Sequence, residues 1–116
     1  MKTIAPLVLV AAFALLGSCA INPHPMDMTR AVQSATTRSD HDALAKHYED
    51  AAKEMRANAD EHKKMLAQYQ AKKDIYGKHA QDLMNHCQGL IRIYDQAAAE
   101  NIAMAKSHRE MAAEAK

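Results

Sequence analysis

The sequence is poor in residues that interrupt helices, and it lacks the motifs that mark common catalytic sites. Its 116 residues include three Gly, three Pro, two Cys and no Trp. So few turn residues exclude a protein built mainly of short strands. There is no Gly-rich phosphate loop, no Cys-x-x-Cys pair and no His-Glu-x-x-His motif. The sequence therefore predicts a protein that is not an enzyme.

Neither sign of charge dominates, because 15 basic residues stand against 14 acidic ones. This balance gives no electrostatic reason to expect a nucleic-acid partner. After position 40 the chain consists mostly of Ala, Glu, Lys, Asp, Gln and Met, which is the composition of long helices. We therefore expect one all-α domain.

What the sequence does contain is an apolar stripe that repeats every seven residues. Its first column has no Lys, Arg, Asp or Glu, and two further columns follow it at distances of three and four residues. A stripe with this period is typical of helices packed as in a coiled coil. The first column is His41, Tyr48, Met55, His62, Tyr69, Tyr76, Leu83, Leu90, Ala97, Met104 and Met111. The others contain Leu44, Ala51, Asn58 and Met65, and Ala45, Ala52, Ala59, Leu66, Ala80, Cys87 and Tyr94.

Residues 1–18 have the three-part pattern of an export signal, with Lys2, an apolar run from Ile4 to Leu16, and then small residues. The run is too short to span a membrane comfortably. It ends in Leu16-Gly17-Ser18-Cys19, which resembles the lipobox of bacterial lipoproteins. An ordinary signal peptide that happens to contain a Cys is the alternative.

The lipobox resemblance implies that the signal is cut before Cys19, and that this residue carries fatty acyl chains holding the protein on a membrane, facing the periplasm. Each buried methylene contributes about 0.8 kcal/mol, so several chains suffice as an anchor without a spanning helix. Ala20 rather than Asp follows the Cys. In this family, that residue implies the outer rather than the inner membrane.

Residues 19–39 contain Pro23, Pro25 and a Ser/Thr cluster, so we expect a flexible tether with at most a short helical turn near 27–34. Ser39 and Asp42 have the spacing of a capping box, which predicts that the first long helix begins at about residue 40.

The segment 40–116 is predicted to form a long antiparallel helical hairpin. Helices are expected at about 40–72 and 77–115, because Lys72-Lys73-Asp74 interrupts the stripe and Gly77 follows. A single continuous rod of about 110 Å is the alternative. In the hairpin, residues whose numbers add up to about 149 face each other. Two helices bury only a narrow core, so we expect dimerisation to a four-helix bundle or binding to another envelope protein.

Seven His and eight Met residues in so short a chain suggest a second function, metal binding. Imidazole, thioether and thiolate ligands together suit copper, and imidazole with thiolate suits zinc. The predicted register gathers His62, Met65, His86 and Cys87 into one cluster. It gathers His41, Met104, His108 and Met111 into another. The alternative is that Met and His residues of the stripe only fill the helix core.

Cys87 is the other thiol besides Cys19. In an oxidising compartment it could form an intermolecular disulfide or ligate a metal, but a quiet buried thiol is the interpretation that we favour.

An Ala-rich heptad helix after a lipobox, ending in Lys116, also resembles the murein lipoproteins and their alanine-zipper relatives. That resemblance implies attachment of the terminal Lys to peptidoglycan. This chain departs from the family pattern in its greater length, in the His and Tyr of its stripe and in Lys72-Lys73-Asp74. No aromatic or basic residue flanks Lys116. These departures weigh against cell-wall attachment.

The sequence thus predicts a lipid-anchored helical envelope protein that serves as a structural or protein-interaction module, with copper or zinc binding as the alternative function.

Overall fold

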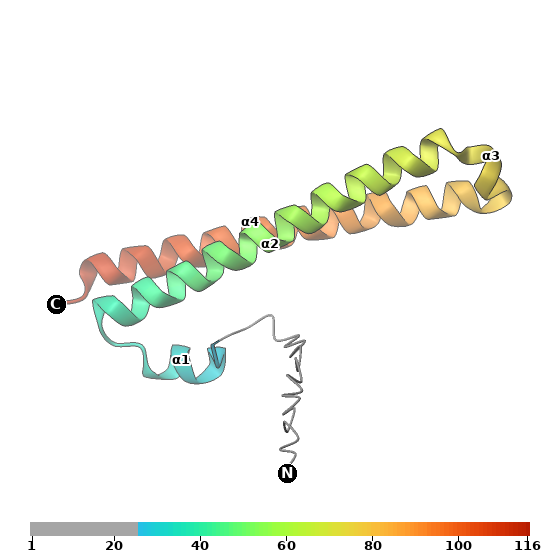
Figure 1. Ribbon diagram of the computed structural model, residues 1–116. Coiled ribbons are helices and arrows are strands. Elements are labelled where there is room, and N and C mark those ends of the chain that lie inside the picture. Colours follow the sequence, from blue (N-terminus) through green and yellow to red (C-terminus); the bar gives the residue numbers. More distant parts are fainter. Residues whose placement is uncertain (1–25) are drawn as a thin grey trace, which may run out of the picture.

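A computed structural model describes residues 26–116, which form two long antiparallel helices joined by a tight turn (Figure 1). α1 (Met28–Ser34) precedes the pair α2 (Arg38–Ala71) and α4 (Ala80–Glu114). α3 (Lys73–Tyr76) and the 3-10 turn η1 (Gly77–His79) connect the pair. The predicted all-α hairpin is confirmed, and the C-terminus lies beside the start of α2.

The predicted signal peptide and Cys19 lie outside the described residues. Within residues 26–116, no helix is long and apolar enough to cross a membrane. The start of the predicted tether also lies outside this range, whereas its later part contains α1, which begins after the N-cap Asp27.

α2 begins two residues before the predicted start, with a capping box formed by Thr37 and Asp40 instead of Ser39 and Asp42. The Thr37 hydroxyl accepts a hydrogen bond from the Asp40 N–H at 3.2 Å, and Asp40 Oδ2 accepts from the N–H groups of Thr36 at 3.0 Å and Thr37 at 2.9 Å. These backbone donors, Thr36 first, lower the pKa of the Asp40 carboxyl. The start of α2 lies near the C-terminus of α4. There Arg38 Nε donates a hydrogen bond to the Ala112 carbonyl at 3.1 Å, which ties the two helix ends together.

The turn lies where the sequence predicted it and depends on Gly77. That residue has φ +53°, a conformation that L side chains rarely adopt. The rings of Tyr69 and Tyr76 meet edge to face at 5.0 Å between centroids and pack the turn against the end of α2.

The seam between α2 and α4 is lined mainly by alanine. Among residues 26–116, seven of the ten buried apolar residues are Ala, and the others are Leu44, Met84 and Cys87. Small side chains allow two helices to approach closely, but each contributes little buried apolar area. The buried alanines are Ala45, Ala52, Ala59, Ala80, Ala98, Ala105 and Ala112.

One of the two apolar columns predicted for α4 is buried, as Ala80 and Cys87 show, but the other is replaced by the column one position later. Ala98, Ala105 and Ala112 are buried, whereas Met104 and Met111 of the predicted column are exposed. The prediction continued one seven-residue count through the turn. The rotation of α4 about its own axis is instead set by the eight residues between Ala71 and Ala80, so the count does not carry over.

One side of the seam, here called the charged flank, carries Asp42, Glu49 and Lys63 on α2 and Asp95 and Arg109 on α4. Arg109 Nη1 lies 2.7 Å from Asp42, and its Nη2 lies 3.1 Å from Glu49. A hydrogen bond to Asp60, and secondly the charge of Asp95, raise the pKa of Lys63. Opposite charges therefore face each other along this side.

The other side of the seam, here called the apolar flank, has a different character. Each helix has one column of residues on either side of its buried columns. Since the charged columns of α2 and α4 meet on one side of the seam, the remaining flanking column of α2 must meet that of α4 on the other side. These columns contain no charged residue between positions 44 and 65 of α2 or 83 and 111 of α4. The flank comprises Leu44, Ala51, Asn58 and Met65 with Leu83, Leu90, Ala97, Met104 and Met111.

Candidate functional site

Three aromatic rings meet across the seam near the open end of the hairpin. His108 of α4 stacks on His41 at 5.5 Å between ring centroids and on Tyr48 at 5.6 Å, both from α2. The Nδ1 atoms of His41 and His108 are 3.2 Å apart, so one imidazole donates a hydrogen bond to the other. The predicted contact between His41 and His108 is present.

The ion pairs of the charged flank hold this ring cluster in place. Arg109 follows His108 directly, and its guanidinium donates hydrogen bonds to Glu49 and to Asp42. These bonds raise the pKa of Arg109, the one to Glu49 first. Asp42 and Glu49 are neighbours of His41 and Tyr48 in the sequence. The pairing of charges therefore aligns the helices so that the rings meet.

His108 is the one buried polar residue among those that the structure describes, at 8% exposure. Burial, and secondly the charge of His41, lower its pKa. His108 is therefore held in the neutral form, in which a ring nitrogen keeps a lone pair for hydrogen bonding or ligation.

Met104 and Met111, the other members of this predicted cluster, precede His108 by four residues and follow it by three. Such residues are neighbours on a helix surface. Both methionines are about half exposed on the apolar flank. Two imidazoles and two thioethers thus occupy one region of the hairpin.

The other predicted cluster, of His62, Met65, His86 and Cys87, is not assembled as the register predicted. Within residues 26–116, no three His, Cys, Asp or Glu side chains lie where they could hold one metal ion. His62 stacks on Tyr94 at 5.6 Å, and Met65 is exposed. His86 points to solvent, with Nε2 3.6 Å from Asp82 on its own helix. It does so because it lies one position before Cys87, outside the buried columns.

Two groups from that predicted cluster remain in the seam. Cys87 is buried as a free thiol. His62 Nδ1 is buried without a hydrogen-bond partner in the described part of the chain, which is unusual for a ring nitrogen. Neither Cys87 nor His62 belongs to a group of three His, Cys, Asp or Glu side chains that could hold a metal ion in the described part of the chain.

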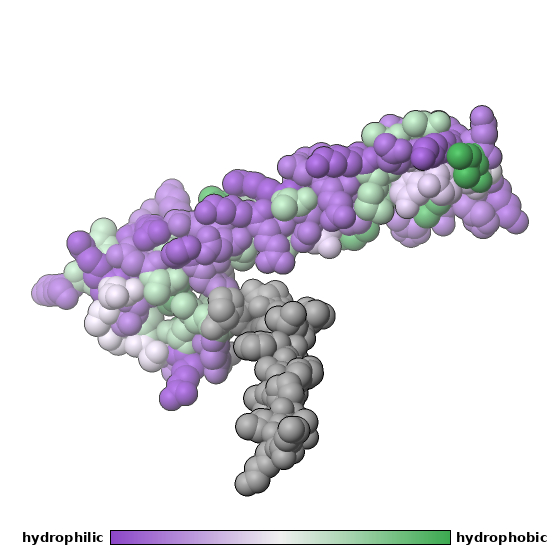
Figure 2. All heavy atoms as spheres, viewed as in Figure 1, coloured by the Kyte–Doolittle hydropathy of each residue, from purple (hydrophilic) through white to green (hydrophobic). Residues whose placement is uncertain are grey.

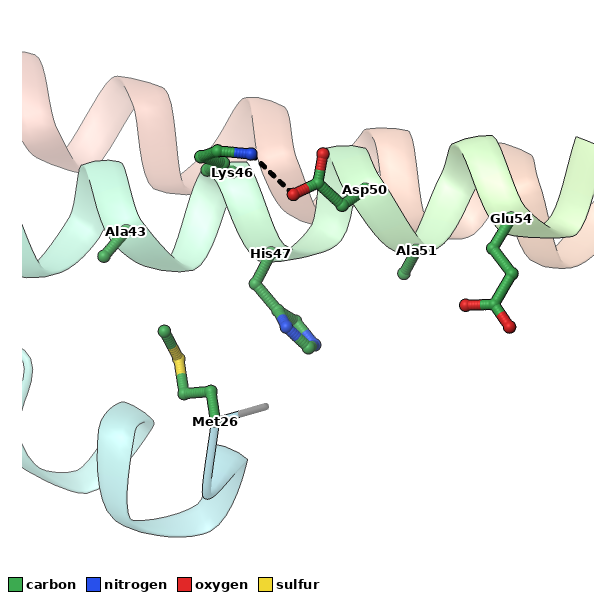
Figure 3. A pocket seen from close by; sticks show the side chains of 7 residues that line it. All are labelled: Met26, Ala43, Lys46, His47, Asp50, Ala51 and Glu54. Carbon is green, nitrogen blue, oxygen red and sulfur yellow. Dashed lines mark hydrogen bonds and ion pairs between the residues drawn. The ribbon is translucent and has the colours of Figure 1, made fainter. Parts of the chain in front are cut away.

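A shallow groove of about 390 Å³ lies where α1 approaches α2 (Figure 3). The Met26 side chain points toward Ala43 of α2, and the His47 ring points into the groove. Lys46 and Asp50, paired at 2.6 Å, stand at one edge. The groove is open to solvent and contains no convergent set of catalytic groups among its lining residues.

Tyr48 and Arg109 belong to the site but were not among the predicted site residues. The signal for Arg109 was present in the sequence, since Asp42 and Glu49 are seven residues apart and Arg109 lies next to His108. Opposite charges beside the stripe of each helix indicate which sides meet in a hairpin. Comparison of the chain with protein-family models, with curated proteins and with solved structures finds no match.

Proposed function

We propose that this protein is a lipid-anchored helical module of the bacterial envelope, and that its apolar flank binds a second copy of the chain to complete a four-helix bundle. The observation that carries this proposal is the distribution of side-chain size. Alanines make up most of the seam, with Leu44 and Met84 the large side chains buried there in the described residues, while four large apolar side chains of the flank are exposed.

Apart from Leu44, which is buried, the large apolar side chains of the flank remain partly or largely exposed in the hairpin. Met65, Leu90, Met104 and Met111, with Ile93 beside them, have between 36% and 60% of their surface accessible. A surface helix normally exposes polar residues on the side away from its core. Contiguous exposed apolar surface marks an interaction site.

A second copy is the partner that this flank fits best. The flank runs along both helices without a charge, so two copies related by a two-fold axis can cover each other's exposed flank residues. Leu44 and Ala51 of the flank already lie beside α1 and Met26. An alanine seam between two helices gives a thin core, and packing of four helices would add the missing apolar area. In the view of Figure 2, hydrophilic atoms cover most of the hairpin, and hydrophobic atoms lie between them in separate patches.

The anchor is the second part of the proposal. It is supported by the lipobox pattern Leu16-Gly17-Ser18-Cys19. Acylation of Cys19 would concentrate the hairpins on one membrane surface and so favour their association. Cells labelled with a fatty acid would incorporate the label into the wild type and not into Cys19→Ala. Equal labelling of the two would refute the anchor.

Sedimentation equilibrium of a soluble form beginning at Ala20 tests the association. We expect the mass of a dimer for the wild type and of a monomer for Leu90→Gln combined with Met65→Gln, because glutamines would be buried in the interface. Ile102→Gln is the matched control, since Ile102 is 38% exposed, like Leu90 at 37%, but lies in the columns of the charged flank. A monomeric wild type, or equal dissociation by Ile102→Gln, would contradict the proposal.

A further inference from the structure

The spacing of the two imidazoles in the ring cluster suits a shared metal ion. A metal about 2.0–2.1 Å from each nitrogen would bridge two Nδ1 atoms 3.2 Å apart at an angle of about 100°, close to the tetrahedral value. The same separation allows the hydrogen bond present in the metal-free pair. The ring centroids are 5.5 Å apart, so each Nδ1 points almost directly at the other. For both lone pairs to meet one ion, the His41 ring, which is less buried than His108, has to turn.

Sulfur ligands lie beside the imidazoles. Met104 and Met111 lie on the two turns of α4 that adjoin His108, on the side of the apolar flank. Methionine is unbranched and flexible, so a thioether can turn toward an ion without movement of the helix. Both side chains are partly exposed, which leaves a route for the ion to enter.

The surroundings favour a cation at this place. The nearby positive charge, on Arg109, is compensated by Asp42 at 2.7 Å and Glu49 at 3.1 Å. His108 is buried and stacked on Tyr48, so its ring is held in one orientation. A fixed imidazole loses little conformational freedom when it ligates.

We propose that His41, His108, Met104 and Met111 form a binding site for copper(I). Two nitrogens and two thioether sulfurs are a soft ligand set that suits copper(I) better than magnesium, calcium or zinc. In the metal-free pair one Nδ1 carries the hydrogen-bonding proton. On binding, this proton leaves Nδ1 as Nε2 of the same ring takes one up, so both Nδ1 lone pairs face the ion and no net proton is released from a neutral pair.

The test is competition for copper(I) against a chromophoric chelator, under reducing conditions, with the full chain purified from membranes. Every protein carries Cys87→Ala, so that this thiol cannot bind copper. We expect the wild-type cluster to withdraw one copper per chain, and His41→Phe with His108→Phe to withdraw none. Met104→Leu with Met111→Leu should weaken binding about tenfold or more for each thioether lost.

These substitutions preserve the packing, since Phe retains the stacked rings and Leu retains an apolar flank. Helical content by circular dichroism verifies folding, and His86→Phe, on the exposed face of α4, is the control that should bind normally. X-ray absorption should show nitrogen and sulfur ligands together. The proposal is overturned if the wild type withdraws no copper, if the double Phe variant binds like the wild type, if His86→Phe loses binding, or if no sulfur ligand is seen.

Discussion

At the scale of single residues, one alignment of α2 along α4 is selected by three aromatic rings, those of His41, Tyr48 and His108. An alanine seam alone would tolerate sliding of one helix along the other, because its side chains are nearly alike. The three stacked rings, and Arg109 held between Asp42 and Glu49, fit together in one alignment only. The neutral imidazole of His108 is part of that fit, so the fit should depend on pH.

We predict that the melting temperature falls as the pH is lowered from about 7.5 to 5.5. The pKa of His108 is lowered in the folded state, so above the unfolded pKa of about 6.5 this residue contributes no pH dependence. Below it, the unfolded chain binds a proton more readily than the folded one, and the free energy of unfolding decreases until the lower folded pKa is passed.

Thermal unfolding followed by circular dichroism at both pH values measures this effect. His108→Phe should flatten the dependence, because the group that titrates is gone while the ring is kept. His79→Phe, in the exposed turn, should retain it. An undiminished pH dependence in His108→Phe would show that His108 is not the responsible residue.

At the scale of elements, the sequence predicted the two helices and their turn because these depend on local signals. The stripe, the absence of Gly and Pro from 40–72, and Gly77 each act within a few residues. The cap was misplaced because Thr37 with Asp40 and Ser39 with Asp42 have the same spacing. The choice between them is made by a distant contact, Arg38 with the Ala112 carbonyl, which no local pattern contains.

The sequence predicted one part of the candidate site correctly, the contact between His41 and His108. At that end of the hairpin, the predicted pairing of residues across the two helices agrees with the pairing in the structure. His86 was misplaced because the rotation of α4 depends on the conformation of the turn. Seven-residue counting indicates which residues share a column, but it cannot give the angle at which a second helix presents that column.

The two glycines of the described residues, Gly77 and Gly89, should respond oppositely to substitution by alanine. Gly89 lies inside α4, and a Cβ there would meet nothing within 4 Å, so Gly89→Ala should stabilise by about 0.5–1 kcal/mol. Gly77 has φ +53°, so Gly77→Ala should destabilise by roughly 1–3 kcal/mol, although space is also free. Urea unfolding measures both, and a stabilising Gly77→Ala would show that the turn has another conformation.

At the scale of the whole molecule, the hairpin buries mainly alanine and leaves Met65, Leu90, Met104 and Met111 exposed on its apolar flank. Association through that flank would add apolar burial to the small amount that folding of the hairpin supplies. We therefore expect folding and dimerisation to be coupled, and the proposed membrane anchor would raise the local concentration of hairpins. The proposed copper site, which includes Met104 and Met111 of the same flank, would then be close to the interface.

The concentration dependence of the melting temperature tests the central claim most directly. If two copies unfold together, mass action requires the melting temperature of the soluble form beginning at Ala20 to rise between about 5 and 200 µM. Leu90→Gln with Met65→Gln should lower it and remove its dependence on concentration, whereas Ile102→Gln should preserve the dependence. A cooperative transition at one temperature across the whole range would contradict the account, because the hairpin would then be stable as a monomer with its apolar flank exposed.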